Sequence, residues 1–181
     1  MEEAILHNYT DSTASGVVDG IFEGWSSVIY IGKTANAKEF KYTYRTHFQW
    51  SRLPNFYWTD SVGHSWGGDV VGVQSHGDYV IDTGLVCNGC DRGFEEIDQS
   101  SVYGTKGTVD LFGIEGIHYG TLRTEVRIPV EHKGRTAAFA SVYGHAYTPS
   151  TMSISIEPIG IDISGYGDKW SWRESFIVKP D

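Results

Sequence analysis

Apolar and polar side chains alternate strictly over residues 40–50. The even-numbered positions are aromatic except for Thr46, whereas the odd-numbered positions are charged or polar. Successive side chains of a β-strand point to opposite faces, and a helix would scatter both sets around its circumference. The segment is therefore predicted to be a strand with one buried, aromatic face and one face in water.

The same alternation recurs at residues 121–131, and a run of small and aromatic residues follows at 136–147. Residues 132–135 between them include Gly134 and are otherwise polar, so we expect a turn and hence a β-hairpin. Pro129 cannot donate a ladder hydrogen bond. We therefore expect its strand to lie at the edge of a sheet.

Shorter runs, separated by Gly, Asp, Asn and Ser, predict further strands at residues 24–31, 70–74, 79–82, 108–112, 152–157, 159–163 and 174–178. The best candidate for a helix is a turn or two at residues 94–99. Antiparallel sheets with one wet face each bury such strands by stacking in two layers. We predict an all-β, single-domain antiparallel β-sandwich over residues 1–181, with a loosely ordered segment at residues 1–16. A closed or flattened β-barrel is the alternative.

The charge balance narrows the range of partners. The 181 residues include 14 Lys and Arg against 23 Asp and Glu, a net charge of −9. Nucleic-acid backbones need a positive surface, so we expect no nucleic-acid partner. The longest apolar runs are four residues, such as that beginning at Val28, far short of the ~20 that a membrane helix requires. We expect no transmembrane segment.

Two interpretations of the cellular location stay open. The first six residues lack the basic and apolar regions of a secretory signal. The chain is either intracellular as written or a secreted chain whose leader has been removed. An abundance of Gly, Tyr, Trp, Ser and Thr with little Lys is common in extracellular β-proteins, so we favour a secreted or extracellular protein.

The two cysteines, Cys87 and Cys90, flank Asn-Gly, a dipeptide typical of tight turns. A zinc site needs four ligands, and the chain has no second pair of cysteines. A redox motif should open a helix, and Asp91-Arg92-Gly93 does not begin one well. We therefore favour a local disulfide, or two unpaired thiols, over half a zinc site or a redox pair.

Residues 63–67 match the pattern G-x-S-x-G and resemble the nucleophile elbow of α/β-hydrolases, which would make Ser65 the nucleophile. In that family the serine lies between a buried strand and a helix. Here the residues after the motif, from Asp69 on, are β-branched and interrupted by Gly72, which predicts a strand. We interpret the match as chance and expect no catalytic residue.

Several residues are candidates for ligand binding. The segment 59–69, which we interpret as a glycine-rich loop, combines Asp60, His64, Trp66 and Asp69. It has no calcium-loop or zinc spacing, so we expect neither a metal nor a cofactor. Trp170-Ser171-Trp172 places both indoles on one face of a strand. Exposed, they would offer a platform for sugar rings, and buried, the commoner fate, they would close the end of the sandwich.

The order of Trp50, Leu53-Pro54, residues 59–63 and Ser65-Trp66 is similar to a motif in small, uncharacterised secreted proteins of Gram-positive bacteria. That resemblance implies a secreted β-protein and assigns no site residue. The sequence as a whole favours a non-enzymatic β-sandwich that binds a protein or a glycan. The alternatives are a serine hydrolase using Ser65 and a toxin that inserts amphipathic β-hairpins into a membrane. Nothing in the sequence indicates the oligomeric state.

Overall fold

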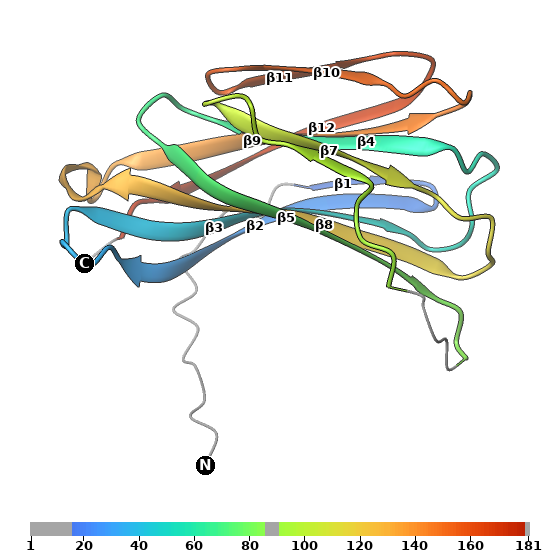
Figure 1. Ribbon diagram of the computed structural model, residues 1–181, viewed down its shortest axis with the longest axis horizontal. Coiled ribbons are helices and arrows are strands. Elements are labelled where there is room, and N and C mark those ends of the chain that lie inside the picture. Colours follow the sequence, from blue (N-terminus) through green and yellow to red (C-terminus); the bar gives the residue numbers. More distant parts are fainter. Residues whose placement is uncertain (1–15, 86–90, 180–181) are drawn as a thin grey trace.

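The computed structural model describes residues 16–85 and 91–179 of the chain. Cys87 and Cys90, with their predicted disulfide, and all but the last residue of the predicted loose segment lie outside these ranges. Figure 1 shows two stacked β-sheets with a two-stranded hairpin over the outer face of one of them.

Each sheet has five strands. Sheet I contains, in spatial order, β1 (Gly16–Asp19), β2 (Phe22–Lys33), β3 (Glu39–Trp50), β8 (Ile117–Pro129) and β5 (Val71–Asp82). Sheet II contains β12 (Gly167–Ile177), β9 (Thr136–Ala146), β4 (Thr59–Trp66), β7 (Gly104–Asp110) and β6 (Glu96–Asp98). The hairpin is β10 (Ser153–Glu157) with β11 (Gly160–Ser164), and a 3-10 turn spans Val130–His132. All strand pairs are antiparallel and the sheets do not close into a barrel, which confirms the all-β sandwich.

Strand β3 has the two faces that its sequence predicts. Every even-numbered residue from Phe40 to Trp50 is at most 4% exposed, and the odd-numbered residues are half-buried. The aromatic rings of this face pack in the space between the sheets, against residues such as Phe139 and Tyr143 of β9. Burial of one such ring contributes about 1.5–3 kcal/mol, so β3 is a main source of stability.

A layer of buried polar side chains divides the interior into two apolar halves. One half is built around Phe48 and Tyr143, and the other around Tyr44 and Trp66. Between them, eight strands each contribute one polar residue at the same level, and we call this set the polar belt. It consists of Ser26, Thr46, His64, Ser75, Thr105, Thr124, Ser141 and Glu174.

Hydrogen bonds run along the polar belt from one sheet to the other. The indole N–H of Trp172 donates to Ser26 Oγ at 2.7 Å, and Ser26 in turn contacts Ser141 Oγ at 3.1 Å. Ser141 contacts Thr46 Oγ1 at 2.8 Å. Buried polar groups must find partners to avoid the cost of losing water, and these bonds hold the two sheets in one relative position.

Three predictions about the strands are wrong. The runs at 121–131 and 136–147 do not form a hairpin, because β8 lies in sheet I and β9 in sheet II, and the chain crosses between the layers at residues 130–135. Strand β8 is not at an edge, because β3 and β5 flank it. Pro129 is tolerated at its end, since β5 pairing begins only at Arg127. The helical turn expected at 94–99 is instead strand β6.

The hairpin β10–β11 covers sheet II on the side away from sheet I. Ser61 Oγ donates to the carbonyl of Met152 at 3.0 Å, and Ile154 and Ile161 pack beside Gly63. As a result β4 is buried on both faces. Within the described ranges, the structure contains no helix long and apolar enough to span a membrane.

Candidate functional site

A pocket of about 600 Å³ lies at one end of the sandwich, where several strands and loops meet. Its walls come from the β1–β2 turn, the end of β3 and the loop after it, the end of β9, and the beginning of β12. We call it the terminal pocket. The side chains that line it include Asp19, Trp50, Arg52, Phe56, Glu115, His145, Tyr147, Asp168 and Trp170.

Aromatic rings form one part of the terminal pocket and are fixed by their neighbours. Trp170 stacks on Phe22 with 4.0 Å between ring centroids, and its indole N–H donates to Asp19 Oδ2 at 3.0 Å. On the other wall Phe56, which is 41% exposed, stacks on Tyr147 at 4.6 Å. The pocket therefore has rigid, flat apolar surfaces next to water.

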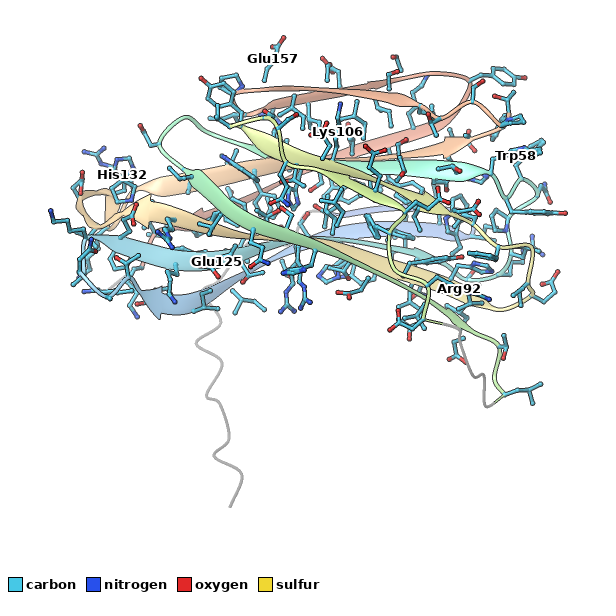
Figure 2. All side chains as sticks on the ribbon, viewed as in Figure 1. Trp58, Arg92, Lys106, Glu125, His132 and Glu157 are labelled. Carbon is cyan, nitrogen blue, oxygen red and sulfur yellow. The ribbon has the colours of Figure 1, made fainter. Side chains whose placement is uncertain are left out.

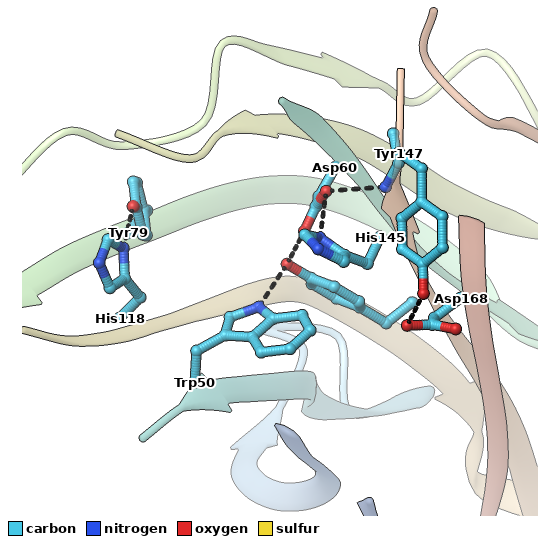
Figure 3. A network of polar contacts seen from close by, with 9 residues as sticks. Trp50, Asp60, Tyr79, His118, His145, Tyr147 and Asp168 are labelled. Atoms are coloured by element: carbon cyan, nitrogen blue, oxygen red, sulfur yellow. Dashed lines mark hydrogen bonds and ion pairs between the residues drawn. The ribbon is translucent and has the colours of Figure 1, made fainter. Parts of the chain in front are cut away.

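His145 is held at the inner side of the terminal pocket by a buried carboxylate (Figure 3). The Nδ1 atom of His145 lies 3.0 Å and 2.9 Å from the two oxygens of Asp60, which is fully buried. Asp60 also accepts hydrogen bonds from the Tyr143 hydroxyl at 2.5 Å and from the Ala146 backbone N–H at 3.1 Å. Asp60 thus fixes the His145 ring through Nδ1, and the His145 side chain is only 3% exposed at the inner wall of the pocket.

The electrostatics of this group follow from its burial. Burial raises the pKa of Asp60, although His145, Tyr143 and Ala146 each act to lower it by donating hydrogen bonds. Burial, together with the nearby charge of Asp60, also raises the pKa of Tyr143 well above its usual value. Tyr143 therefore stays protonated as a donor, and it accepts a hydrogen bond from the Trp50 indole at 3.1 Å.

The rim of the terminal pocket is mainly acidic. Asp19, Glu115 and Asp168 supply carboxylates, and Arg52 supplies one cation. The Tyr147 hydroxyl donates to Asp168 Oδ2 at 2.5 Å, and this bond raises the pKa of Tyr147 to about 12. The rim thus presents mostly acceptors, which suit a ligand rich in hydroxyl donors.

The residues predicted to bind a ligand are placed in three different locations. Trp170 lines the terminal pocket and Asp60 lies behind His145. His64, Trp66 and Trp172 are at most 5% exposed inside the sandwich, where a surface ligand cannot reach them. The segment 59–69 is mostly strand β4 and not a binding loop, because the hairpin β10–β11 covers its second face.

Asp69, the remaining predicted ligand-binding residue, is exposed in the turn after β4, whereas the terminal pocket is near the beginning of that strand. The sequence did not indicate that His145, Tyr147 and Asp168 would meet in one pocket. His145 lies in β9, Tyr147 directly follows that strand and Asp168 lies in β12, and no sequence motif connects the three. The acid–histidine pair becomes visible only when β4 and β9 are placed side by side.

Ser65 is not in the position of a hydrolase nucleophile. It is fully buried in β4, opposite Gly104 of β7 and Ala140 of β9, so a strand continues where a nucleophile elbow would turn. Its Oγ makes no hydrogen bond with any described residue. The neighbouring His64 instead contacts Thr46 and Thr124. Among the described residues, no group of three or more potential metal ligands occurs.

Comparisons with known proteins give similarities of overall shape. No family model and no curated protein sequence matches the chain. A solved structure titled pore forming protein aligns over 91% of this chain and 90% of its own, with 6% identity and a TM-score of 0.49. A DUF4466 family protein from Parabacteroides merdae aligns over 82% of this chain and 42% of its own, with 14% identity and a TM-score of 0.36.

A third structure is AvmM, which its title describes as catalysing macrocyclization in alchivemycin A biosynthesis. It aligns over 85% of this chain and 88% of its own, with 10% identity and a TM-score of 0.26. All three TM-scores are below 0.5. The function proposed below therefore rests on the geometry of the chain itself.

Proposed function

We propose that the protein is a secreted, non-enzymatic binding protein that recognises a glycan in the terminal pocket. The observation that carries this proposal is the combination of flat aromatic walls with a rim of three carboxylates around His145. Sugar rings offer apolar C–H faces and many hydroxyl donors, which match these two features. A pocket of about 600 Å³ falls in the range of small-molecule sites and is large enough for one or two sugar rings.

The arrangement supports binding rather than catalysis. The acid–histidine pair of Asp60 and His145 resembles two members of a nucleophilic triad, but such chemistry needs a Ser, Cys or Thr within hydrogen-bond reach of Nε2. None of those residue types is among the residues that line the terminal pocket. His145, whose side chain is only 3% exposed, is therefore interpreted as a buried part of the pocket wall that Asp60 holds in one orientation.

A glycan array probed with the labelled, folded protein tests the proposal. We expect saturable binding to a defined set of glycans. Asp168→Asn, an exposed change at the rim, should weaken binding about tenfold or more, since it replaces a charged acceptor. Trp25→Ala is the matched control, because Trp25 is a half-buried tryptophan on the outer face of sheet I, away from the pocket. An array without any retained glycan, or equal losses in both variants, would refute the proposal.

A second candidate function is attachment to a membrane surface. Phe56, Tyr57 and Trp58 form a run of aromatic residues beside the terminal pocket that are 41%, 51% and 42% exposed. Aromatic side chains of this kind favour the membrane–water interface. With a net charge of −9, zwitterionic vesicles are the appropriate target. Co-sedimentation with phosphatidylcholine vesicles, lost in Trp58→Ala and kept in Trp25→Ala, would support this function, and no co-sedimentation would exclude it.

A further inference from the structure

The outer face of sheet I places cationic side chains directly opposite one another. Arg45 of β3 pairs across the strands with Arg123 of β8, and Arg123 pairs with His76 of β5. Lys41 and Arg127 form a second such pair on the same face. Like charges directly opposite each other in a sheet are destabilising. In a chain of net charge −9, this concentration of basic residues needs an explanation.

Carboxylates on the same face neutralise these cations only in part. Asp78 Oδ2 lies 3.6 Å from Arg123 Nε, and Glu39 Oε2 lies 3.8 Å from an Nη of Arg127. Both distances exceed that of a hydrogen bond. Among the ion pairs of the described residues, none within 4.0 Å includes Arg45. Arg45 therefore has no carboxylate partner among the described residues, and Arg123 has only the long contact with Asp78.

The Nε–H groups of these guanidiniums also lack hydrogen-bond acceptors among the described residues. The Nε atoms of Arg45, Arg123 and Arg127 are buried and make no hydrogen bond with any described residue. Buried donors of charged groups nearly always have acceptors, because an unsatisfied one costs free energy. The three arginines thus lie on one face of sheet I, and the Nε–H group of each has no acceptor among the described residues.

Arg45 and Arg123 border a hollow of about 250 Å³. It is lined by Thr43, Arg45, Gln74, His76, Arg123 and Glu125. Glu125 is labelled in Figure 2. It lies between Thr43 of β3 and Gln74 of β5, in the cross-strand row next to the row that contains Arg123. The hollow therefore has a cationic side made by two arginines and a side with a carboxylate, an amide and a hydroxyl.

We propose that this hollow binds a carboxylate-bearing sugar, with the chemistry of a uronic acid. Arg45 and Arg123 bind the carboxylate, for which the planar guanidinium is well shaped. Glu125, Gln74 and Thr43 hydrogen-bond the hydroxyl groups. A bare oxyanion would be repelled by Glu125, whereas a hydroxyl can donate to it. The site lies on sheet I, and its assignment is independent of the terminal pocket.

Isothermal titration at low ionic strength with glucuronate, glucose and sulfate tests the proposal. We expect saturable binding of glucuronate, and binding of glucose weaker by about tenfold or more. Arg123→Gln and Arg45→Gln should each weaken glucuronate by a similar factor. Arg173→Gln is the matched control, because it removes the same charge from an exposed position on sheet II and should leave the affinity unchanged.

Four results would overturn the assignment. They are no saturable binding of glucuronate, glucose binding as tight as glucuronate binding, an equal loss in Arg173→Gln, and sulfate binding that is tighter than glucuronate binding and unchanged in Glu125→Gln.

The Tm of the ligand-free Arg45→Gln protein provides a second readout. Relief of the repulsion from Arg123 should keep it at or above that of the wild type. A clear fall would show that the arginine pair serves the fold, and would also overturn the proposal. Asp168→Asn, which tests the terminal pocket, should leave glucuronate binding intact, so failures of the two sites are distinguishable.

Discussion

His64 Nδ1 lies 2.9 Å from Thr46 Oγ1, at the level where eight strands each place one polar side chain inside the sandwich. On the other side of the ring, Nε2 lies 2.7 Å from Thr124 Oγ1. The imidazole therefore bridges sheet II, which carries it, to two strands of sheet I. Both of its contacts are to neutral hydroxyls.

This arrangement predicts how stability depends on pH. Burial lowers the pKa of His64 to about 3, whereas the unfolded chain titrates near the ordinary histidine value of about 6.5. Below about pH 6.5, His64 binds a proton in the unfolded state but stays neutral in the folded state. The free energy of unfolding therefore falls as the pH falls. The slope due to His64 is at most about 1.4 kcal/mol per pH unit, and it ends near pH 3.

Urea unfolding measured at several pH values between about 7.5 and about 4.5 checks this prediction. His64→Gln should be less stable than the wild type at neutral pH and should lose the part of the slope that is due to His64. His47 and His118, whose pKa values burial also lowers, should keep their share. His76→Gln, a change of an exposed histidine, is the control and should keep the whole slope. A wild-type free energy of unfolding that does not change over this range would contradict the predicted burial of His64.

Ser65 and Ser61 give a matched pair on one face of β4. Ser65 Oγ is buried without a hydrogen-bond partner among the described residues, whereas Ser61 Oγ donates to the carbonyl of Met152. We expect Ser65→Ala to be neutral or to stabilise by about 1 kcal/mol, since it removes an unsatisfied polar group. Ser61→Ala should destabilise by about 1 kcal/mol. Chemical denaturation compares the two, and a larger loss in Ser65→Ala would mean that its hydroxyl has a partner.

The strands with one wet face could be predicted from the sequence, and those with two covered faces could not. Residues 40–50 alternate because sheet I has water on one side. Strand β4 shows no alternation, because β10–β11 covers its second face, and its glycines and polar residues were therefore interpreted as a loop. Alternation also does not say which sheet a strand joins, which is why β8 and β9 were wrongly paired as a hairpin.

The candidate sites could be predicted only in part, for a related reason. That Trp170 and Trp172 share one face of a strand follows from period two and is confirmed, but their different burial depends on where β12 begins relative to the pocket. The contact between His145 and Asp60 joins residues 85 positions apart, and no local pattern marks it. The rows of basic residues on sheet I likewise appear only when the strand register is known.

Asp60→Asn should destabilise the protein, since Asp60 accepts hydrogen bonds from Tyr143, His145 and Ala146. An asparagine side chain has one acceptor oxygen and a donor NH₂ in place of the second oxygen, so at least one of the three donors loses its partner. The expected loss is about 1–3 kcal/mol in the free energy of unfolding. Asp69→Asn, an exposed change in the turn after β4, is the control and should have little effect. Equal stability of Asp60→Asn and the wild type would show that the carboxylate is not the acceptor for these groups.

The contact between the hairpin β10–β11 and sheet II predicts a rescue by a second substitution. A Cβ atom at Gly144 of β9 would overlap Ile163 Cδ1 and come within 2.7 Å of Met152 Sδ. Gly144→Ala should therefore lower the free energy of unfolding by about 1–3 kcal/mol through overpacking. Ile163→Val removes the overlapping Cδ1 atom and alone should cost about 0.5–1.5 kcal/mol. Because the two changes act on one contact, the double variant should be more stable than the sum of the single effects predicts, as measured by a double-mutant cycle. Strict additivity would mean that the hairpin does not pack on β9 at this position.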